Sequence, residues 1–167
     1  MGDTGAVAFL LVDAIRQSML APAMAQPETL ILTADDCRAL LDPRELLPAL
    51  RSAFAKYSTE RSVPARRYPV VLPQSQETGA GGMVLAPGLV PGIPAYTVKV
   101  NAKFPGSRPA IKGAILLHDL ETGDLLAILD SGHITSVRTA LAGALGADVL
   151  ARKDASRVAV IGAGMQG

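Results

Sequence analysis

The sequence has little of what disulfide bonds and metal sites require. Cys37 is its single cysteine, so the chain can form no internal disulfide, and we expect it in a reducing compartment, the cytoplasm. Its two histidines are His118 and His133, and no group of residues has the spacing of a zinc site. We therefore predict no metal, and we interpret Cys37 as a small core residue of a short helix rather than as a nucleophile.

Aromatic residues, long apolar runs and an excess of one charge are scarce as well. Aromatic residues make up 4% of the chain, which leaves few surfaces on which nucleic-acid bases could stack. The 16 basic and 15 acidic residues are interspersed, so no strongly basic surface is expected. No stretch approaches the roughly 20 apolar residues that a membrane span requires. We therefore expect a small-molecule partner, with no nucleic acid and no membrane.

The chain does have enough apolar material for a core, because 49% of its 167 residues are hydrophobic. Residues 1–28 differ from the rest: an apolar run at Ala6–Val12 and small residues at Ala23–Ala25 are typical of a secretory signal. However, no basic residue precedes that run, and Met19 and Met24 are alternative starting points. We expect residues 1–28 to be a disordered extension or a mis-assigned start, with a secretory signal as the alternative.

Two helices are predicted near the beginning of the remaining sequence. Thr33 and Asp36 form a capping pattern for a short helix that ends near Leu41. A second helix follows Asp42, with a proline at its first position and apolar residues at helical spacing as far as Tyr57. Pro48 conflicts with that helix, because an internal proline costs about 3 kcal/mol, so the helix must either begin near Pro48 or bend there.

Strands and one long helix are expected further along the chain. Strand-length β-prone or apolar segments lie at residues 68–72, 83–86, 95–100, 111–118 and 125–129. Thr122-Gly123-Asp124 marks a hairpin turn between the last two, and the set favours an antiparallel or mixed sheet. A helix is predicted from Thr135, as its N-cap, to Arg152, and small residues along it allow a neighbouring element to approach closely.

The sequence closes on a Gly-x-Gly-x-x-Gly pattern. The β-branched segment Val158–Ile161 has the character of a buried parallel strand, and Gly162, Gly164 and Gly167 follow it at the spacing of a dinucleotide-binding turn. There the glycines allow a tight turn, close approach of a pyrophosphate and close packing of a helix. The pattern predicts the first strand and turn of a Rossmann domain, with an ordinary glycine-rich tail as the alternative.

Three cationic residues stand beside apolar elements. These are Arg66, which follows Pro64 and Ala65, Lys99 within a strand, and Arg138 in what we expect to be the first turn of the long helix. A guanidinium group offers a rigid fork to a carboxylate, and burial can lower the pKa of a lysine into the range of proton transfer. Together they suit an amino or imino acid, although each taken alone also fits a solvated surface charge.

Taken together, several motifs resemble the ornithine cyclodeaminase and mu-crystallin family over about residues 30–167. The segments that carry the resemblance are Pro64-Ala65-Arg66, Thr97-Val98-Lys99-Val100, Phe104-Pro105-Gly106, residues 122–130, Ile134-Thr135-Ser136-Val137-Arg138-Thr139-Ala140 and residues 160–166. The resemblance implies a homodimer in which a substrate and dimerisation domain of mixed sheet and helices adjoins a Rossmann domain that binds NAD or NADP. It also implies cyclodeamination of ornithine to proline, reduction of cyclic ketimines such as pyrroline-2-carboxylate, or dehydrogenation of alanine.

The resemblance further assigns roles to individual residues. It makes Arg66 and Arg138 the clamp on the substrate carboxylate and Lys99 the catalytic or substrate-polarising amine. It places Thr139 near the cofactor phosphates and Gly162, Gly164 and Gly167 at the pyrophosphate turn. Two departures stand out: Ser107 replaces an asparagine that is common in relatives, and the catalytic aspartate of cyclodeaminases has no counterpart in this sequence.

These observations define the expected organisation and function. The fold class is α/β, with an α+β substrate-binding and dimerisation domain of mixed sheet at residues 29–153 and the beginning of a truncated Rossmann domain at residues 154–167. We expect an NAD(P)-dependent enzyme of small amino or imino acids, inactive and with impaired cofactor binding in this shortened form. The alternatives are a non-catalytic module that binds a small molecule or dimerises, and a secreted binding domain.

Overall fold

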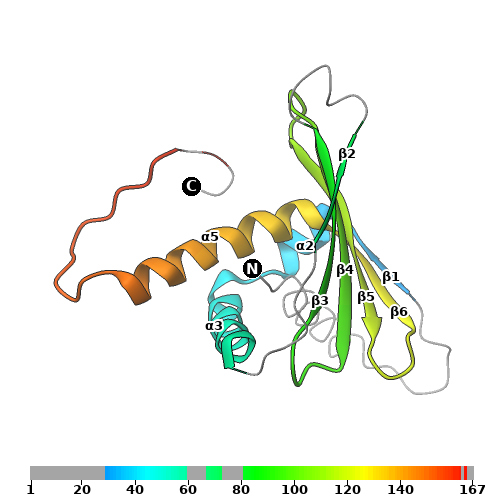
Figure 1. Cartoon of the computed structure of the whole chain (residues 1–167), viewed down its shortest axis with the longest axis horizontal. Helices are drawn as coiled ribbons and strands as arrows, with labels where there is room; N and C mark the ends of the chain where they lie inside the picture. The colour runs from blue at the N-terminus through cyan, green and yellow to red at the C-terminus, as the bar shows by residue number, and fades with distance from the viewer. Residues whose placement is uncertain (1–28, 60–66, 73–80, 163, 165–167) are drawn as a thin grey trace.

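The computed structural model describes residues 29–59, 67–72, 81–162 and 164. Our expectation for residues 1–28 lies outside these ranges. The elements are β1 (Leu30–Leu32), α2 (Ala34–Leu40), α3 (Pro43–Thr59), β2 (Tyr68–Val71), β3 (Gly82–Leu89), β4 (Ala95–Lys103), β5 (Ile111–Asp119), β6 (Leu125–Asp130) and α5 (Ser131–Leu150). The six strands form one sheet, and these three helices lie on the same side of it (Figure 1).

The sheet is mixed, as predicted. Its strand order is β1-β6-β5-β4-β3-β2, and neighbouring strands from β2 to β6 pair antiparallel. The three-residue strand β1 pairs parallel with β6, which aligns Leu30 with Ala127 and Leu32 with Leu129. The sequence analysis missed β1, because so short a strand carries no alternation of its own and is defined by a partner far along the chain.

The core lies between the sheet and the helices. Ile115 and Leu117 of β5 and Leu129 of β6 are fully buried, and they point to one face because side chains alternate along a strand. Leu50 of α3 and Ile134 of α5 cover them from the helical side, within one hydrophobic cluster. Full burial of a side chain of this size stabilises the fold by about 1.5–3 kcal/mol. The core therefore fixes which face of each strand the helices cover.

Cys37 of α2 belongs to this core and is fully buried. Burial raises the pKa of its thiol to about 11, and the carboxylates of Asp130 and Asp36 act in the same direction. A thiol with so high a pKa is a poor nucleophile, because the thiolate is the reactive form. The structure thus agrees with the interpretation of Cys37 as a core residue.

Both early helices form where the sequence predicts them. At the start of α2, the Thr33 side chain accepts a hydrogen bond from the backbone N–H of Asp36, and the Asp36 carboxylate accepts one from the N–H of Thr33 at 2.9 Å. This reciprocal capping box satisfies two N–H groups that the helix itself cannot pair. Helix α3 begins at Pro43 and contains Pro48 inside it, so the helix does not begin at that proline.

The predicted start of the long helix is wrong by one turn. Helix α5 begins at Ser131, and its N-cap is Asp130, whose carboxylate accepts a hydrogen bond from the Gly132 N–H at 2.8 Å. Thr135 therefore lies inside the helix, and Arg138 lies beyond the first turn. Asp130 is also the last residue of β6, so strand and helix follow each other with no loop between them.

The predicted strand at Val158–Ile161 is not formed. These residues have extended, unassigned backbone, and the side chains of Val158 and Val160 are 86% and 68% exposed. A parallel strand requires a neighbour that supplies hydrogen bonds and a covering layer. Within the described residues no segment pairs with Val158–Ile161.

Candidate functional site

Lys99 lies on the helix-covered face of β4. Thr97, two residues earlier on the same face, is only 1% exposed, and Lys99 itself is half-buried. In the sheet, Lys99 stands between Ala86 of β3 and the fully buried Ile115 of β5. An amine in this position is partly removed from water, which favours its neutral form.

Arg138 of α5 lies close enough to Lys99 to act on its charge. Burial lowers the pKa of Lys99 to about 8, and the positive charges of Arg138 and then Arg67 contribute further. The structure therefore brings together two of the three cations that the sequence analysis selected. The third, Arg66, lies outside the described residues, and its role in a carboxylate clamp stays a prediction.

Arg67 is a nearby cation that the sequence analysis missed. It directly precedes β2, whose first residue Tyr68 aligns with Leu85 of β3. The residue after Leu85 is Ala86, which aligns with Lys99, so Arg67 continues the row that contains Lys99. Arg67 is exposed, and the small Ala86 is the residue between the two cations. This relation depends on the strand register, which the sequence does not reveal.

Three polar side chains connect β4 to the beginning of α5. The amide oxygen Oδ1 of Asn101 accepts a hydrogen bond from Ser131 Oγ at 2.6 Å, and Asn101 Nδ2 donates to Thr135 Oγ1 at 3.5 Å. Ser131 is fully buried and Thr135 is 8% exposed. Asn101 and Ser131 were also missed, because nothing local in the sequence indicates that they meet.

β4 and α5 each carry a buried hydroxyl group without a hydrogen-bond partner among the described residues. The Oγ1 atoms of Thr97 and Thr139 are inaccessible to water and make no hydrogen bond within the described part of the chain. An unsatisfied buried hydroxyl costs about 1–3 kcal/mol, so such atoms are commonly partners for a ligand. This observation fits the role near a cofactor that we expect for Thr139.

The glycine-rich end of the chain has one of the features that a nucleotide turn needs. Gly162 has a φ angle of +102°, in the left-handed region that favours glycine. Gly164 is described and exposed, whereas Gly167 lies outside the described residues. Gly162 therefore has a backbone conformation that a tight turn could use, and the cofactor roles of Gly162, Gly164 and Gly167 stay predictions.

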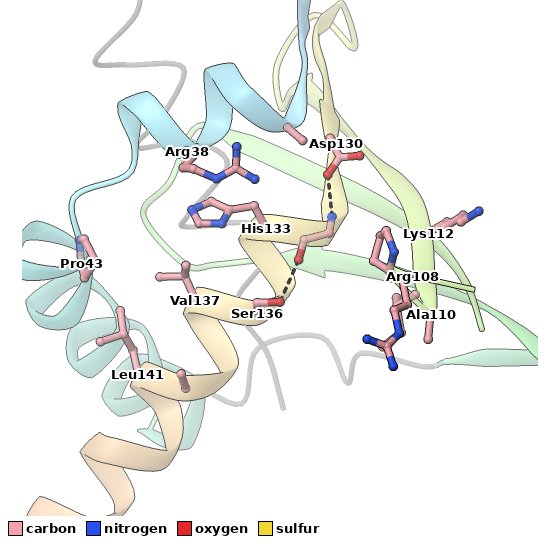
Figure 2. Close-up of a pocket in the computed structure, with 15 residues that line it drawn as sticks. Arg38, Pro43, Arg108, Ala110, Lys112, Asp130, His133, Ser136, Val137 and Leu141 are labelled. Carbon is pink, nitrogen blue, oxygen red and sulfur yellow. Dashed lines mark hydrogen bonds between the residues drawn. The ribbon is translucent and has the colours of Figure 1, made fainter. Parts of the chain in front are cut away.

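A groove of about 1200 Å³ opens on another side of α5 (Figure 2). It is bounded by α2, by α5 and by the residues between β4 and β5, and its lining includes Arg38, Arg108, Lys112, His133, Ser136 and Val137. Lys99 and Arg138 do not line it. Figure 2 shows Arg38 and His133 next to each other, while Arg108 and Lys112 lie beyond the other side of the helix. The four basic groups therefore do not converge on one point.

His133 illustrates the character of this groove. Burial lowers the pKa of its imidazole, the nearby Arg38 guanidinium lowers it further, and Asp130 acts in the opposite direction.

Among the described residues, no three histidine, cysteine or acidic side chains are placed to hold a metal ion. No helix in the described ranges is both long and apolar enough to cross a lipid bilayer.

Comparison with known proteins gives consistent relationships. The model of the "Ornithine cyclodeaminase/mu-crystallin family" matches residues 27–167. A Delta(1)-pyrroline-2-carboxylate reductase of Bacillus cereus is 27% identical over 141 residues, which cover 82% of this chain and 42% of the relative. An alanine dehydrogenase of Archaeoglobus fulgidus is 33% identical over 144 residues, which cover 83% of this chain and 42% of the relative.

Solved structures agree with these sequence matches. The Thermococcus litoralis Delta(1)-pyrroline-2-carboxylate reductase in complex with NADH and L-proline has a TM-score of 0.72 at 28% identity, covering 83% of this chain and 43% of that one. An archaeal alanine dehydrogenase dimer with bound NAD has a TM-score of 0.68 at 28% identity, covering 77% and 39%. The chain thus spans about two fifths of the length of the relatives that it matches.

Proposed function

Since this chain belongs to the ornithine cyclodeaminase/mu-crystallin family, we propose that it forms the substrate-binding part of an NAD(P)-dependent enzyme of small amino or imino acids. The observation that carries the proposal is the half-buried Lys99 beside Arg138. One group is a guanidinium suited to a carboxylate, and the other is an amine whose proton is exchangeable near pH 8. In this proposal residues 29–153 bind substrate and residues 154–167 begin the cofactor domain.

The two cations have different chemical tasks. Arg138 binds the substrate carboxylate through paired N–H donors and so orients the adjacent carbon atom. In its charged form Lys99 donates a proton from Nζ to the substrate nitrogen or another polar group of the substrate. In its neutral form it accepts a proton from such a group. Arg66 is proposed as the second arginine of the clamp, and Arg67 adds positive charge that favours an anionic substrate.

NAD or NADP supplies the hydride chemistry when it is bound. Thr139 and Gly162 would hold it in this chain, because the buried Thr139 hydroxyl has no hydrogen-bond partner among the described residues and Gly162 has a positive φ angle. Two relatives with solved structures carry NADH or NAD. Gly164 and Gly167 complete the proposed cofactor residues.

Our choice among reaction types is based on the relatives, because the geometry of the site does not distinguish them. Reduction of pyrroline-2-carboxylate is our first candidate, because reductases of this substrate are among both the sequence and the structural relatives. Alanine dehydrogenation and cyclodeamination of ornithine are the other candidates of the same class. The second class of function is a non-catalytic module that binds a small molecule or dimerises.

We also propose that the chain forms a homodimer through the outer face of the sheet. This face, opposite the described helices in Figure 1, carries apolar side chains in adjacent register: Met83, Leu85, Tyr96, Val98, Val100, Leu116 and Ile128. They are half-buried in one copy. A contiguous apolar sheet face of this kind is typical of a protein interface, and one structural relative is described as a dimer.

Calorimetry with L-proline, L-alanine and L-ornithine tests the substrate assignment, because each ligand carries the carboxylate that Arg138 is proposed to bind. We expect at least one ligand to bind the wild-type chain and Arg138→Ala to weaken that binding by about 10- to 100-fold, as for loss of a charge-assisted hydrogen bond. The exposed Arg152→Ala variant is the control and should bind like the wild type. Equal affinity in the Arg138→Ala variant would remove Arg138 from the site.

A second experiment separates the enzyme from the non-catalytic module. A form of the protein that completes the cofactor domain is mixed with NADH or NADPH and Δ1-pyrroline-2-carboxylate, and a fall in absorbance at 340 nm reports hydride transfer. The enzyme proposal predicts that this form is active and that Lys99→Ala abolishes the activity. Carboxylate binding without turnover in that completed form would support the binding module instead.

A further inference from the structure

Asn101 has a bridging position between the sheet and the long helix. It lies on β4, two residues after Lys99 and on the same face, because side chains of a strand alternate with a period of two. Its amide contacts both Ser131 Oγ, at 2.6 Å, and Thr135 Oγ1, at 3.5 Å, at the beginning of α5. One side chain therefore connects the strand of Lys99 to two successive turns of the helix that carries Arg138.

The backbone of β5 is shaped to accept this amide. Gly113 is the cross-strand partner of Asn101, and a Cβ atom at Gly113 would lie 2.5 Å from Asn101 Oδ1. The same atom would lie 2.0 Å from the backbone oxygen of Val100, a distance that real Cβ atoms do not show. The absence of a side chain at Gly113 thus leaves the space that Asn101 occupies.

The bridge also aligns the two candidate catalytic elements. Residues three or four apart on a helix lie on the same side, so Ser131, Thr135 and Arg138 follow one stripe of α5. Lys99 and Asn101 follow one face of β4. Since Asn101 binds the first two members of the helical stripe, it fixes where the third member, Arg138, lies relative to Lys99.

We propose that Asn101 is a positioning residue that holds α5 against β4 so that Arg138 and Lys99 face the same substrate. The inference rests on the proposed function for the identity of that substrate. An apolar side chain at this position could fill the space but could not select one register of helix on strand. A half-buried amide with both of its polar atoms hydrogen-bonded does so, because a shift of the helix breaks these bonds.

The test measures the pKa of Lys99 without any ligand. Protein labelled with ¹³C-lysine is titrated by NMR, and Lys99→Arg identifies the signal. In Asn101→Ala we expect α5 to separate from β4 locally, so that water and distance from Arg138 raise the pKa of Lys99 by about one unit toward the ordinary lysine value. The wild-type value should lie near 8.

A matched pair at Thr135 keeps the test valid if Asn101→Ala fails to fold. Thr135→Val retains the shape but removes the hydroxyl that Asn101 binds, whereas Thr135→Ser retains the hydroxyl. We expect Thr135→Val to raise the pKa of Lys99 and Thr135→Ser to leave it near the wild-type value. Ser136→Ala is the control, because Ser136 Oγ donates to Gly132 O within the same helix and its loss should not affect Lys99.

The outcomes are distinct. An unchanged pKa of Lys99 in folded Asn101→Ala and Thr135→Val overturns the proposal, as does a wild-type pKa at the ordinary value, because Lys99 would then be neither removed from water nor close to the charge of Arg138. Circular dichroism reports the fold of each variant. The proposed function fails separately, in calorimetry: if no carboxylate binds while the pKa of Lys99 still depends on Asn101, the positioning role stands and the substrate assignment does not.

Discussion

The positive charge of Arg138 in α5 acts on the amine of Lys99 in β4, and together with burial, the larger cause, it lowers the pKa of that amine to about 8. The two residues are separated by almost 40 positions in the sequence, and the folding of α5 onto the sheet brings their charges into range of each other. Two positive charges in one partly buried place disfavour each other. The arrangement costs stability in the free chain and suits an anionic ligand.

Stability should therefore increase with pH in a defined window. Below pH 8 Lys99 is protonated in both the folded and the unfolded chain, and the cost of holding its charge is fully present. Between pH 8 and about 10.5 the unfolded chain binds more protons than the folded chain, so the free energy of unfolding rises with pH. With the partial exposure of Lys99 taken into account, we expect a rise of about 1–2 kcal/mol.

Lys99→Met isolates this contribution. The variant keeps most of the side-chain volume and has no charge to titrate, so it should be more stable than the wild type at pH 7 by about the same 1–2 kcal/mol. The difference should disappear near pH 10.5. Urea unfolding at pH 7, 9 and 10.5 measures both curves, and parallel curves would contradict the lowered pKa.

Gly113 should tolerate no side chain. Gly113→Ala places a methyl group 2.0 Å from the Val100 carbonyl oxygen and 2.5 Å from Asn101 Oδ1, so the strands must separate. We expect a loss of about 1–3 kcal/mol in the free energy of unfolding. Gly143→Ala in the exposed part of α5 is the control: nothing lies within 4 Å of the new atom, and alanine favours a helix by up to about 1 kcal/mol.

Cys37 should react slowly in the folded chain. Its side chain is fully buried and its pKa is raised to about 11. At pH 8 both the small fraction of thiolate and the poor access of the reagent to the sulfur therefore limit the rate of modification. We expect Ellman's reagent to modify the thiol only over hours in buffer and within minutes in 8 M urea, since unfolding removes both obstacles. Rapid modification of the native protein would place Cys37 outside the core.

Local patterns in the sequence were sufficient for most elements. The capping box at Thr33, the alternation in β4 and the Thr-Gly-Asp turn before β6 each depend on residues a few positions apart. The start of α5 was missed because Ser131 and Gly132 are weak helix formers, while the residue that caps them, Asp130, also ends a strand. The extended segment Val158–Ile161 has the composition of a strand, but composition does not supply a partner.

The candidate site was predicted only in part for the same reason. Lys99 and Arg138 could be selected as cations next to apolar elements, and their position in a family motif gave them roles. Asn101 and Arg67 could not be selected, because one depends on hydrogen bonds between β4 and α5 and the other on the register of three strands. Such relations between distant segments appear only once the chain is folded.

The outer sheet face provides the last prediction. Val98 lies near the middle of this face, between Pro87 of β3 and Leu116 of β5. If two copies pack through it, Val98→Glu places a charge in a desolvated interface, where an unpaired carboxylate is strongly unfavourable. We expect sedimentation velocity to show a dimer for the wild type and a monomer for Val98→Glu.

Thr122→Glu in the exposed hairpin turn is the control and should remain dimeric. Because Val98 points away from Lys99, a monomeric variant that still binds a carboxylate ligand would show that the substrate site and the interface are independent, whereas a wild-type monomer would rule out this face as a self-association surface.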